Sequence, residues 1–533
     1  MPWYSPPTRQ EVTLILFCLT TFILFYNVES SFQYLGTDPT NSEVLVGRLG
    51  LNKANHKLST SGGDALEKEV FGEWEGHERR AASNGGGIRR RDVDEDKSAA
   101  FWIEKETVTA SQKPEIFGNI AVDDGFFHWG AQVPQVTVVK HVPGFTILDN
   151  VIVAGGTIFL VSDHASSLPP LGSIASSAVA PTDPPREEDW QVLSGDEARV
   201  KLGSYGGLIH GVSWLSTDAT PSNHTLFSLW RTYSSLDPSI TSDGQTSLPP
   251  PRRIFFPNIP TFTGIRPDLN KPIVLRHRSP SGFHPFLPKA AFPTLGLMYK
   301  EDWEDFALMA VPFVLKRVVV ADRGAATRSR SDVPPISFPC TGSEMGASQY
   351  WWEPVRRSLA AFLGVDQALE KTWRGKERPT ITYISAQDAD LGPALRNVDH
   401  DALVSALEKM GRDYSYTVNI VSSQGSWTER MTAIAKSTIV LGVYGDSLTD
   451  CLYMKPSSHS MVMEIFPPDV FVGDGEIAVR SLGTRYIAWR NNQQFSGESL
   501  PPVALPGSVP ARDISVDPAA IVQAIRKEVD RAA

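Results

Sequence analysis

The sequence has 533 residues, of which 41% are hydrophobic and 21% charged, as is usual for a globular protein with room for two domains. Its formal net charge of -10 argues against a broad nucleic-acid surface, because phosphate binding needs clustered lysine and arginine. Three cysteines are too few for a disulfide-rich scaffold.

An uncharged apolar run over residues 12–28 begins VTLILFCLTTFILFY and has the minimum length of a membrane-spanning helix. Arg9 precedes the run and Glu29 follows it, so we expect residues 1–11 to form a cytosolic tail. The run is then the transmembrane signal-anchor of a single-pass type II protein in the Golgi or ER membrane, with its catalytic domain in the lumen. The alternative is a signal peptide that is cleaved near Ser30.

Residues 29–112 are rich in glycine and charge and show little apolar periodicity. Such a composition buries too little apolar surface to offset chain entropy, so this segment is predicted to be a disordered stem. Further along, Asn223-His224-Thr225 is a glycosylation sequon, which suits a lumenal location.

The first predicted domain covers residues 113–375. Its clearest feature is a hairpin over 150–163, in which Gly155-Gly156 separates two β-branched runs. Residues 165–200 are rich in serine, proline and alanine, which predicts a surface insertion. The other expected elements are strands over 135–142, 271–277 and 315–322 and an amphipathic helix over 349–364.

The second predicted domain covers residues 376–533, where short apolar runs alternate with segments of helical spacing. This alternation predicts an α/β fold with a parallel, doubly wound sheet. The expected strands are 380–385, 416–422, 438–445, 461–467 and 484–490, and the expected helices are 400–411, 426–437, 447–454, 476–483 and 517–532.

A candidate ligand site follows the strand TIVLG, where the chain reads VYGDSLTD before the next predicted helix. Ligands of open α/β sheets bind where strands end, and helix N-termini attract anions. Gly445 would allow close approach of the backbone, while Ser447 and Thr449 supply hydroxyl donors. A diphosphate would fit there, although a tight structural turn would produce the same pattern.

The segment 442–471 resembles the signature region of glycosyltransferase family 61, especially its fungal members. The matching residues are Gly442, Val443, Gly445, Leu448, Thr449, Met454, Pro456, Glu464, Phe466 and Pro467. Upstream, residues 378–385, 399–410 and 426–442 also resemble the strands and helices of that family.

This resemblance implies an inverting enzyme with a GT-B fold, in which two Rossmann-like domains face a cleft. It implies a nucleotide-sugar donor, often UDP-linked, and a glycan or glycoprotein acceptor. Family members transfer xylose, N-acetylglucosamine or arabinose, and GT-B enzymes generally need no metal, so no cofactor is expected. The sequence is consistent with this, since no convincing Asp-x-Asp lies at a strand end; Asp388-Ala389-Asp390 has the spacing but lies in a polar stretch that is typical of a solvated turn.

Two residues depart from the family pattern. Tyr444 stands where the family has histidine, and Ala386 stands where it has arginine. Basic residues offset the charge of the donor phosphates. We therefore expect Arg396, Arg430 or Lys455 to substitute in an active enzyme.

The resemblance and the residue chemistry together suggest roles at the site. The donor-binding candidates are Gly445, Ser447, Leu448, Thr449, Glu464 for the ribose and Arg396 for the phosphates. Inversion also needs a base that takes the proton of the acceptor hydroxyl. The candidate bases are Asp446, Asp450, His128 and His284. Trp351 and Trp352 could stack on a sugar, but burial in the core is the favoured interpretation.

Several alternatives remain open at this point. Tyr444 and Ala386 would also suit an inactive, lumenal glycan-binding or scaffold protein on a degenerate transferase fold. A secreted α/β hydrolase is disfavoured, since no Gly-x-Ser-x-Gly elbow occurs at the Gly445 turn. Cys340 and Cys451 could form one lumenal disulfide or remain two buried thiols, while Cys18 lies in the apolar N-terminal run.

Overall fold

A computed structural model describes the chain from residue 127 onward with internal gaps. The described ranges are 127–178, 183–217, 224–267, 274–278, 283–329, 345–365, 379–389, 392–457, 460–507 and 511–531. The predicted tail, membrane span and stem therefore lie outside the described residues. None of the helices within these ranges is long and apolar enough to cross a membrane. All described residues fall in one compact unit, Arg90–Ala533.

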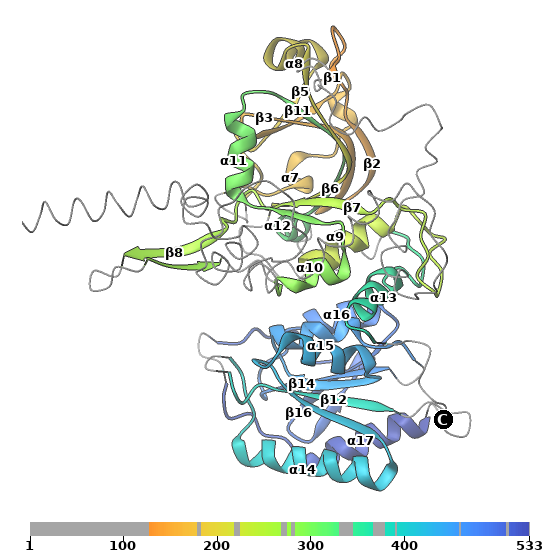
Figure 1. Ribbon diagram of the computed structural model, residues 1–533. Helices are drawn as coiled ribbons and strands as arrows, with labels where there is room; N and C mark the ends of the chain where they lie inside the picture. Colours follow the sequence, from red (N-terminus) through yellow and green to blue (C-terminus); the bar gives the residue numbers. More distant parts are fainter. Residues whose placement is uncertain are drawn as a thin grey trace, which may run out of the picture. The chain divides into compact units, whose positions relative to one another are not determined.

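The N-terminal lobe (127–365) is built on a mixed sheet that curls strongly (Figure 1). Its strands are β1 (Phe127–His128), β2 (Thr137–Val142), β3 (Phe145–Ala154), β4 (Thr157–Val161), β5 (Trp190–Leu193), β6 (Tyr205–Ser216), β7 (Pro251–Phe255), β10 (Gly296–Met298) and β11 (Phe313–Ala321). The four parallel strands follow the spatial order β10-β7-β6-β11, which is the 3-2-1-4 order of a Rossmann half. Strand β3 pairs with β11 in the antiparallel direction. Beyond β3, β4 pairs with β3 in the antiparallel direction and β5 pairs with β4 in the parallel direction.

Helices and one separate hairpin complete this lobe. They are η4 (Ala165–Ser167), α7 (Leu171–Ile174), α8 (Gly195–Leu202), α9 (Thr225–Ser234), α10 (Phe286–Ala291), α11 (Lys300–Leu308), α12 (Arg323–Arg328), α13 (Glu353–Phe362) and the hairpin of β8 (Phe262–Pro267) with β9 (Val274–Arg278). Helix α9 packs against β11 and β3, and all ten of its residues are buried.

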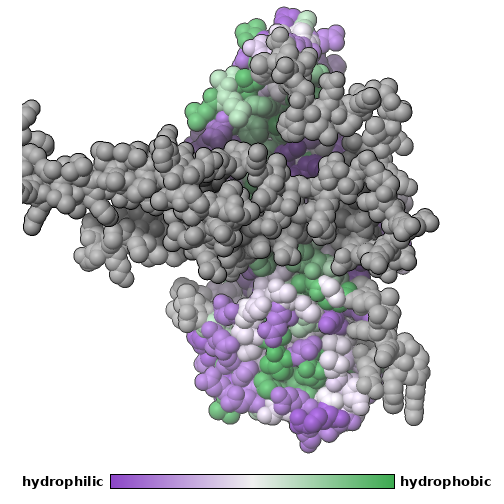
Figure 2. Space-filling model, viewed as in Figure 1, coloured by the Kyte–Doolittle hydropathy of each residue, from purple (hydrophilic) through white to green (hydrophobic). Residues whose placement is uncertain are grey.

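The C-terminal lobe (379–531) is a doubly wound sheet of order β13-β12-β14-β15-β16-β17, in which only β17 is antiparallel. Its elements are β12 (Thr380–Ser385), α14 (Asn397–Tyr414), β13 (Thr417–Ser422), α15 (Trp427–Lys436), β14 (Ile439–Val443), η6 (Asp446–Tyr453), β15 (Met461–Phe466), α16 (Asp474–Ser481), β16 (Arg485–Arg490), β17 (Gln493–Phe495), η7 (Gly497–Ser499) and α17 (Pro518–Arg531). Helices α14 and α17 cover one face of the sheet, and α15 and α16 cover the other (Figure 1). The visible face of this lobe is mostly hydrophilic, with a hydrophobic patch at its centre (Figure 2).

The prediction of an α/β fold with parallel sheets is confirmed, and both sheets are consistent with a Rossmann-like fold. The hairpin over 150–163 is also confirmed, because β3 and β4 pair around Gly155 and Gly156 at φ of 57° and 83°. Such positive φ values favour glycine in a two-residue turn.

One element prediction is wrong. Residues 165–200 are not a surface insertion, since β5 pairs with β4 and the Trp190 side chain is buried in the core. The serine and proline residues of this segment are typical of a loop, so they hid the strand in the sequence. The helix expected over 447–454 is confirmed as the 3-10 helix η6, Asp446–Tyr453. Leu448 and Cys451 of η6 and Met454, which follows it, are all buried, as expected for a spacing of three along a 3-10 helix.

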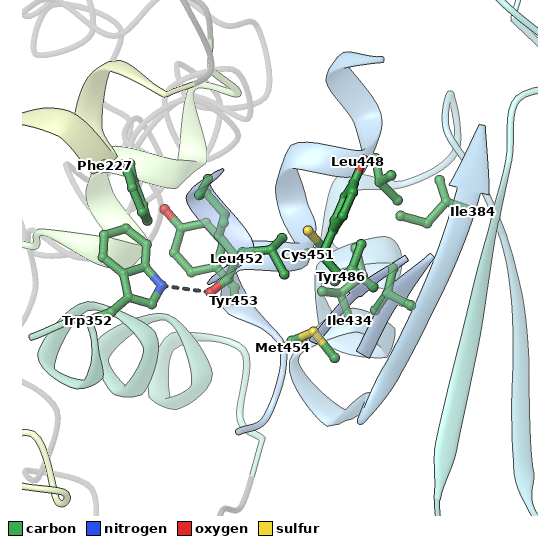
Figure 3. Packing of buried hydrophobic residues seen from close by; sticks show 14 of the residues in the cluster. Phe227, Trp352, Ile384, Ile434, Leu448, Cys451, Leu452, Tyr453, Met454 and Tyr486 are labelled. Carbon is green, nitrogen blue, oxygen red and sulfur yellow. Dashed lines mark hydrogen bonds between the residues drawn. The ribbon is translucent and has the colours of Figure 1, made fainter. Parts of the chain in front are cut away.

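An aromatic cluster lies where α13 meets η6 and α16. The indole Nε1 of Trp352 donates to the carbonyl oxygen of Leu452 at 2.7 Å, and that of Trp351 donates to Ser481 at 3.2 Å. Both rings lie 4.9 Å from the ring of Phe227, and Figure 3 shows the Trp352 bond to Leu452 in this packing. The interpretation of Trp351 and Trp352 as core residues is therefore confirmed.

Candidate functional site

The order of strands in the C-terminal sheet creates a switch point between β12 and β14. The connection from β12 runs through α14 on one face, whereas the connection that leads back to β14 runs through α15 on the other. Crevices that bind ligands form at the carboxyl ends of such a strand pair.

The loop after β14 lies at this switch point. Gly445 has a φ of 132°, a region that residues with a side chain rarely adopt. A Cβ added to Gly445 would lie 3.9 Å from Pro393, which belongs to the loop after β12. Gly445 and Asp446 are exposed, and Ser447 is half-buried. The predicted ligand loop is therefore accessible and adjoins the neighbouring strand end.

Two other residues of the predicted loop, Leu448 and Tyr444, have structural roles. Leu448 is 4% exposed and anchors η6 in the core, while its backbone N–H donates to Gly445 O at 3.1 Å. Thr449 is half-buried. Tyr444, in place of the family histidine, is buried and stacks on Phe466 with ring centroids 5.3 Å apart.

A second group of side chains comes from the start of α15. Ser426 caps this helix, because its side chain accepts from Glu429 N. One turn further on, the Arg430 guanidinium donates from Nε to Asp450 Oδ2 at 2.9 Å and from a terminal nitrogen to Ser423 O at 2.9 Å. The Arg430 side chain is 11% exposed, so a positive charge is held nearly buried beside η6.

Asp450 is the buried partner of this arginine. Burial raises the pKa of the Asp450 carboxyl, and the charge and hydrogen bond of Arg430 lower it only in part. Because the Asp450 carboxylate accepts the hydrogen bond from Arg430, it positions the guanidinium. It is therefore poorly placed to take a proton from a substrate.

His284 from the N-terminal lobe packs against this group. Its ring stacks on Trp427 with centroids 4.9 Å apart and planes 10° apart. Burial and then the positive charge of Arg430 lower the pKa of His284 to about 4, so its ring is neutral at pH 7. Nδ1 accepts from the backbone N–H of Phe286 at 3.3 Å, which leaves the proton on Nε2. His284 is thus a neutral hydrogen-bond donor.

This titration predicts a pH-dependent stability. Histidine in the unfolded chain gains its proton near pH 6.5, but folded His284 does so only near pH 4. Stability present above pH 6.5 is therefore lost as the pH falls toward 4. In urea unfolding between pH 7 and 4.5, we expect the wild type to lose more free energy of unfolding than His284→Gln does. The exposed His128→Gln should behave as the wild type, and equal losses in all three proteins would contradict the prediction.

Three buried polar atoms at the carboxyl edge of the sheet lack hydrogen-bond partners among the described residues. They are Gln387 Oε1 after β12, Ser423 Oγ after β13 and Trp427 Nε1 at the start of α15. Buried polar groups are normally paired, and unpaired ones cost free energy. A polar ligand bound at this edge would supply the partners.

The remaining predicted residues lie elsewhere or serve other contacts. His128 is exposed on β1, and its ring contacts Tyr205 of β6. Glu464 lies within β15, where it is buried and accepts from the Tyr486 hydroxyl. Arg396 is bound to Asp399 and Ser515.

Of the three cations considered as substitutes, Arg430 has the suitable position. The backbone of Lys455 bonds to Ser437 ahead of β14, at the opposite edge of the sheet from Gly445. Trp427, which stacks on His284, was not predicted as a site residue, although the helix expected over 426–437 begins beside it.

Several predictions fall on residues outside the description. Asn223, Cys340 and Asp390 are among these, while Asp388 is exposed in a turn. Thr225 of the sequon is 5% exposed. Cys451 is buried with a free thiol, and burial, Glu464 and Asp450 raise its pKa. Within the described ranges, no group of histidine, cysteine or acidic side chains is arranged to hold a metal ion.

Comparison with known protein families gives no matching family model, and no curated protein sequence matches the chain.

Proposed function

We propose that the chain is an inverting glycosyltransferase that uses a nucleotide-sugar donor, UDP-linked, and a glycan or glycoprotein acceptor. The GT-B reading of the fold, with two Rossmann-like domains facing a cleft, is part of this proposal. So is its place as a type II protein in the Golgi membrane with a lumenal catalytic domain.

The observation that carries the proposal is the set of unpaired polar groups around the switch point. The exposed Gly445 loop, the start of α15 and the nearly buried Arg430 lie at the carboxyl edge of one sheet. Helix N-termini and arginine both favour phosphate oxygens. A donor diphosphate would accept from Ser423 Oγ and Trp427 Nε1, and a hydroxyl of the donor's ribose or sugar would donate to Gln387 Oε1.

In this reaction the acceptor hydroxyl attacks the anomeric carbon, the bond to the diphosphate breaks, and the diphosphate leaves with the electron pair. Arg430 would offset the charge that develops on the leaving group, and the Nε2–H of His284 would donate to it. Asp450 keeps Arg430 in place. Among the candidate bases, Asp446 is the exposed carboxylate beside the loop.

Thermal unfolding of the full chain with UDP tests the proposal. A ligand at a hundred times its Kd stabilises a protein by about 2.7 kcal/mol, so UDP should raise the unfolding temperature clearly. Thr449→Ala should weaken UDP binding by about tenfold or more, as expected for losing a hydrogen bond to a charged group. Thr417→Ala is the matched control, because Thr417 is exposed at the amino edge of the same sheet.

No stabilisation by UDP in a folded protein would contradict the proposal. That result would favour the alternative, a non-catalytic lumenal glycan-binding or scaffold protein. The buried Tyr444 and the alanine at position 386, where the family has arginine, support this alternative. If UDP binds, hydrolysis of different UDP-sugars then identifies the donor.

A further inference from the structure

A groove with a volume of about 480 Å³ opens on the N-terminal sheet, at the amino-terminal ends of β6 and β11. Ligand sites usually have volumes of about 300–1,000 Å³. The residues that line the groove include Phe127, Trp129, Gln132, Asn150, Val314 and Lys316. None of these residues belongs to the site at the Gly445 loop.

The sheet is irregular where Asn150 and Lys316 meet. Asn150 interrupts β3 with a φ of 60°, and the ladder with β11 pairs Asp149 with Arg317 and Val151 with Leu315 on either side. The ladder between β11 and β6 shifts at the same place, between Leu315 and Arg317. Bulges of this kind change the direction of side chains and are frequent beside functional sites. Residues other than glycine that are held at positive φ are also frequent there.

The polar side chains of the groove are available for a ligand. Lys316 is exposed and makes no ion pair or hydrogen bond within the described part of the chain, whereas its neighbour Arg317 binds Asp149 through two bonds of 2.7 Å. Asn150 donates one amide hydrogen to Gln135 O at 3.3 Å. Gln132 adds a second amide to the lining.

Phe127 forms the exposed part of the apolar wall. Its ring is 36% exposed and lies edge-on to Trp129 at 6.0 Å. Trp129 is only 9% exposed and supports Phe127 from the core, where its Nε1 donates to Gly203 O at 2.9 Å. An exposed ring held in this way suits the C–H face of a pyranose, while amides and an ammonium suit its hydroxyls. A purely apolar ligand would leave Asn150 and Lys316 unused, and Lys316 would repel a cation.

We propose that this groove binds a short pyranose oligosaccharide and so anchors the glycan part of the acceptor. The role as an acceptor site rests on the proposed transferase function, but sugar binding itself does not. Aromatic stacking provides affinity, and Asn150, Gln132 and Lys316 provide orientation.

The test titrates the full chain with cellotriose, mannotriose and chitotriose by calorimetry and saturation-transfer NMR. We expect at least one trisaccharide to bind, with a tenfold or greater loss of affinity in Lys316→Ala and in Asn150→Gly. Glycine accepts a φ of 60°, so Asn150→Gly removes the amide without straining the backbone. Lys409→Ala, at an exposed position of α14, is the matched control and should bind as the wild type.

Failure of all three trisaccharides to bind would overturn the proposal, as would unchanged affinity in Lys316→Ala. If Asn150→Gly fails to fold, Lys316→Ala decides alone, since the exposed Lys316 side chain makes no ion pair or hydrogen bond with the residues that the structure describes. UDP stabilisation measured on the same variants separates the two proposals. Sugar binding that depends on Lys316, without any UDP binding, would support the sugar site in the groove and contradict the transferase proposal. UDP binding without any sugar binding would support the transferase proposal and contradict the sugar site.

Discussion

Arg430→Met is expected to lower the free energy of unfolding at pH 7 by about 3–5 kcal/mol and to abolish stabilisation by UDP. The Arg430 and Asp450 side chains are only 11% and 17% exposed, so removal of the guanidinium leaves a buried carboxylate without its counter-ion. Burial already raises the pKa of Asp450 with the arginine present. Without it, Asp450 must bind a proton on folding.

The pH dependence of this variant follows from that proton. The unfolded carboxyl titrates near 3.8, so the cost of Arg430→Met is largest at neutral pH and shrinks as the pH falls toward that value. Arg430→Met combined with Asp450→Asn should recover most of the stability but no UDP binding. Urea unfolding from pH 7 to 4.5 measures both effects.

A matched control is Arg412→Met, because Arg412 pairs with Glu408 on the surface of α14, where the two side chains are 70% and 54% exposed. Exposed pairs contribute about 0–1 kcal/mol, so this variant should change little. Should Arg430→Met cost no more than Arg412→Met, the buried ion pair would not have the importance assigned to it here.

Trp352→Ala should destabilise the protein by about 3–5 kcal/mol, the usual cost of deleting a buried large aromatic side chain. Trp352 is 4% exposed and packs on Phe227 and Tyr453. Trp352→Phe keeps a ring but removes the hydrogen bond to Leu452 O, which should cost about 1–3 kcal/mol. Chemical denaturation of both variants provides the measurement.

The Trp352 variants also test a link to the ligand loop. Leu452 belongs to η6, whose first residues follow Gly445, so Trp352→Phe should weaken UDP stabilisation as well. Tyr350→Ala is the control, because Tyr350 is 38% exposed and its substitution should change stability by less than about 0.5 kcal/mol. Equal stability of Trp352→Ala and Tyr350→Ala would show that the cluster does not hold η6.

The sequence predicts the C-terminal sheet well because its signals are local. Strands β12, β14 and β15 are short, fully buried runs, and helices such as Trp427–Lys436 carry a cap and an amphipathic face. The Gly445 loop was located for the same reason. Its role as a ligand site remains a prediction.

The N-terminal lobe was harder to predict for physical reasons. Helix α9 is buried on every side, including its polar residues Ser228, Arg231 and Thr232, whereas polar residues at helical spacing normally mark a face that meets water. Strand β6 contains three glycines, which weaken the strand signal. The meeting of His284 with Trp427 and Arg430 depends on tertiary packing between segments far apart in the chain, and no local pattern encodes it.

Helix α17 has a consequence for the order of events during synthesis. Its residues Ile521, Ile525 and Val529 are buried in the core, and Glu528 pairs with Arg485 at the start of β16. Just before it, Ile514 and Val516 bridge to Leu395 and Asn491. While α17 is still inside the ribosomal tunnel, α14 alone covers its face of the C-terminal sheet and part of that face stays bare. This lobe can therefore finish folding only after α17 emerges, whereas the N-terminal sheet can form earlier.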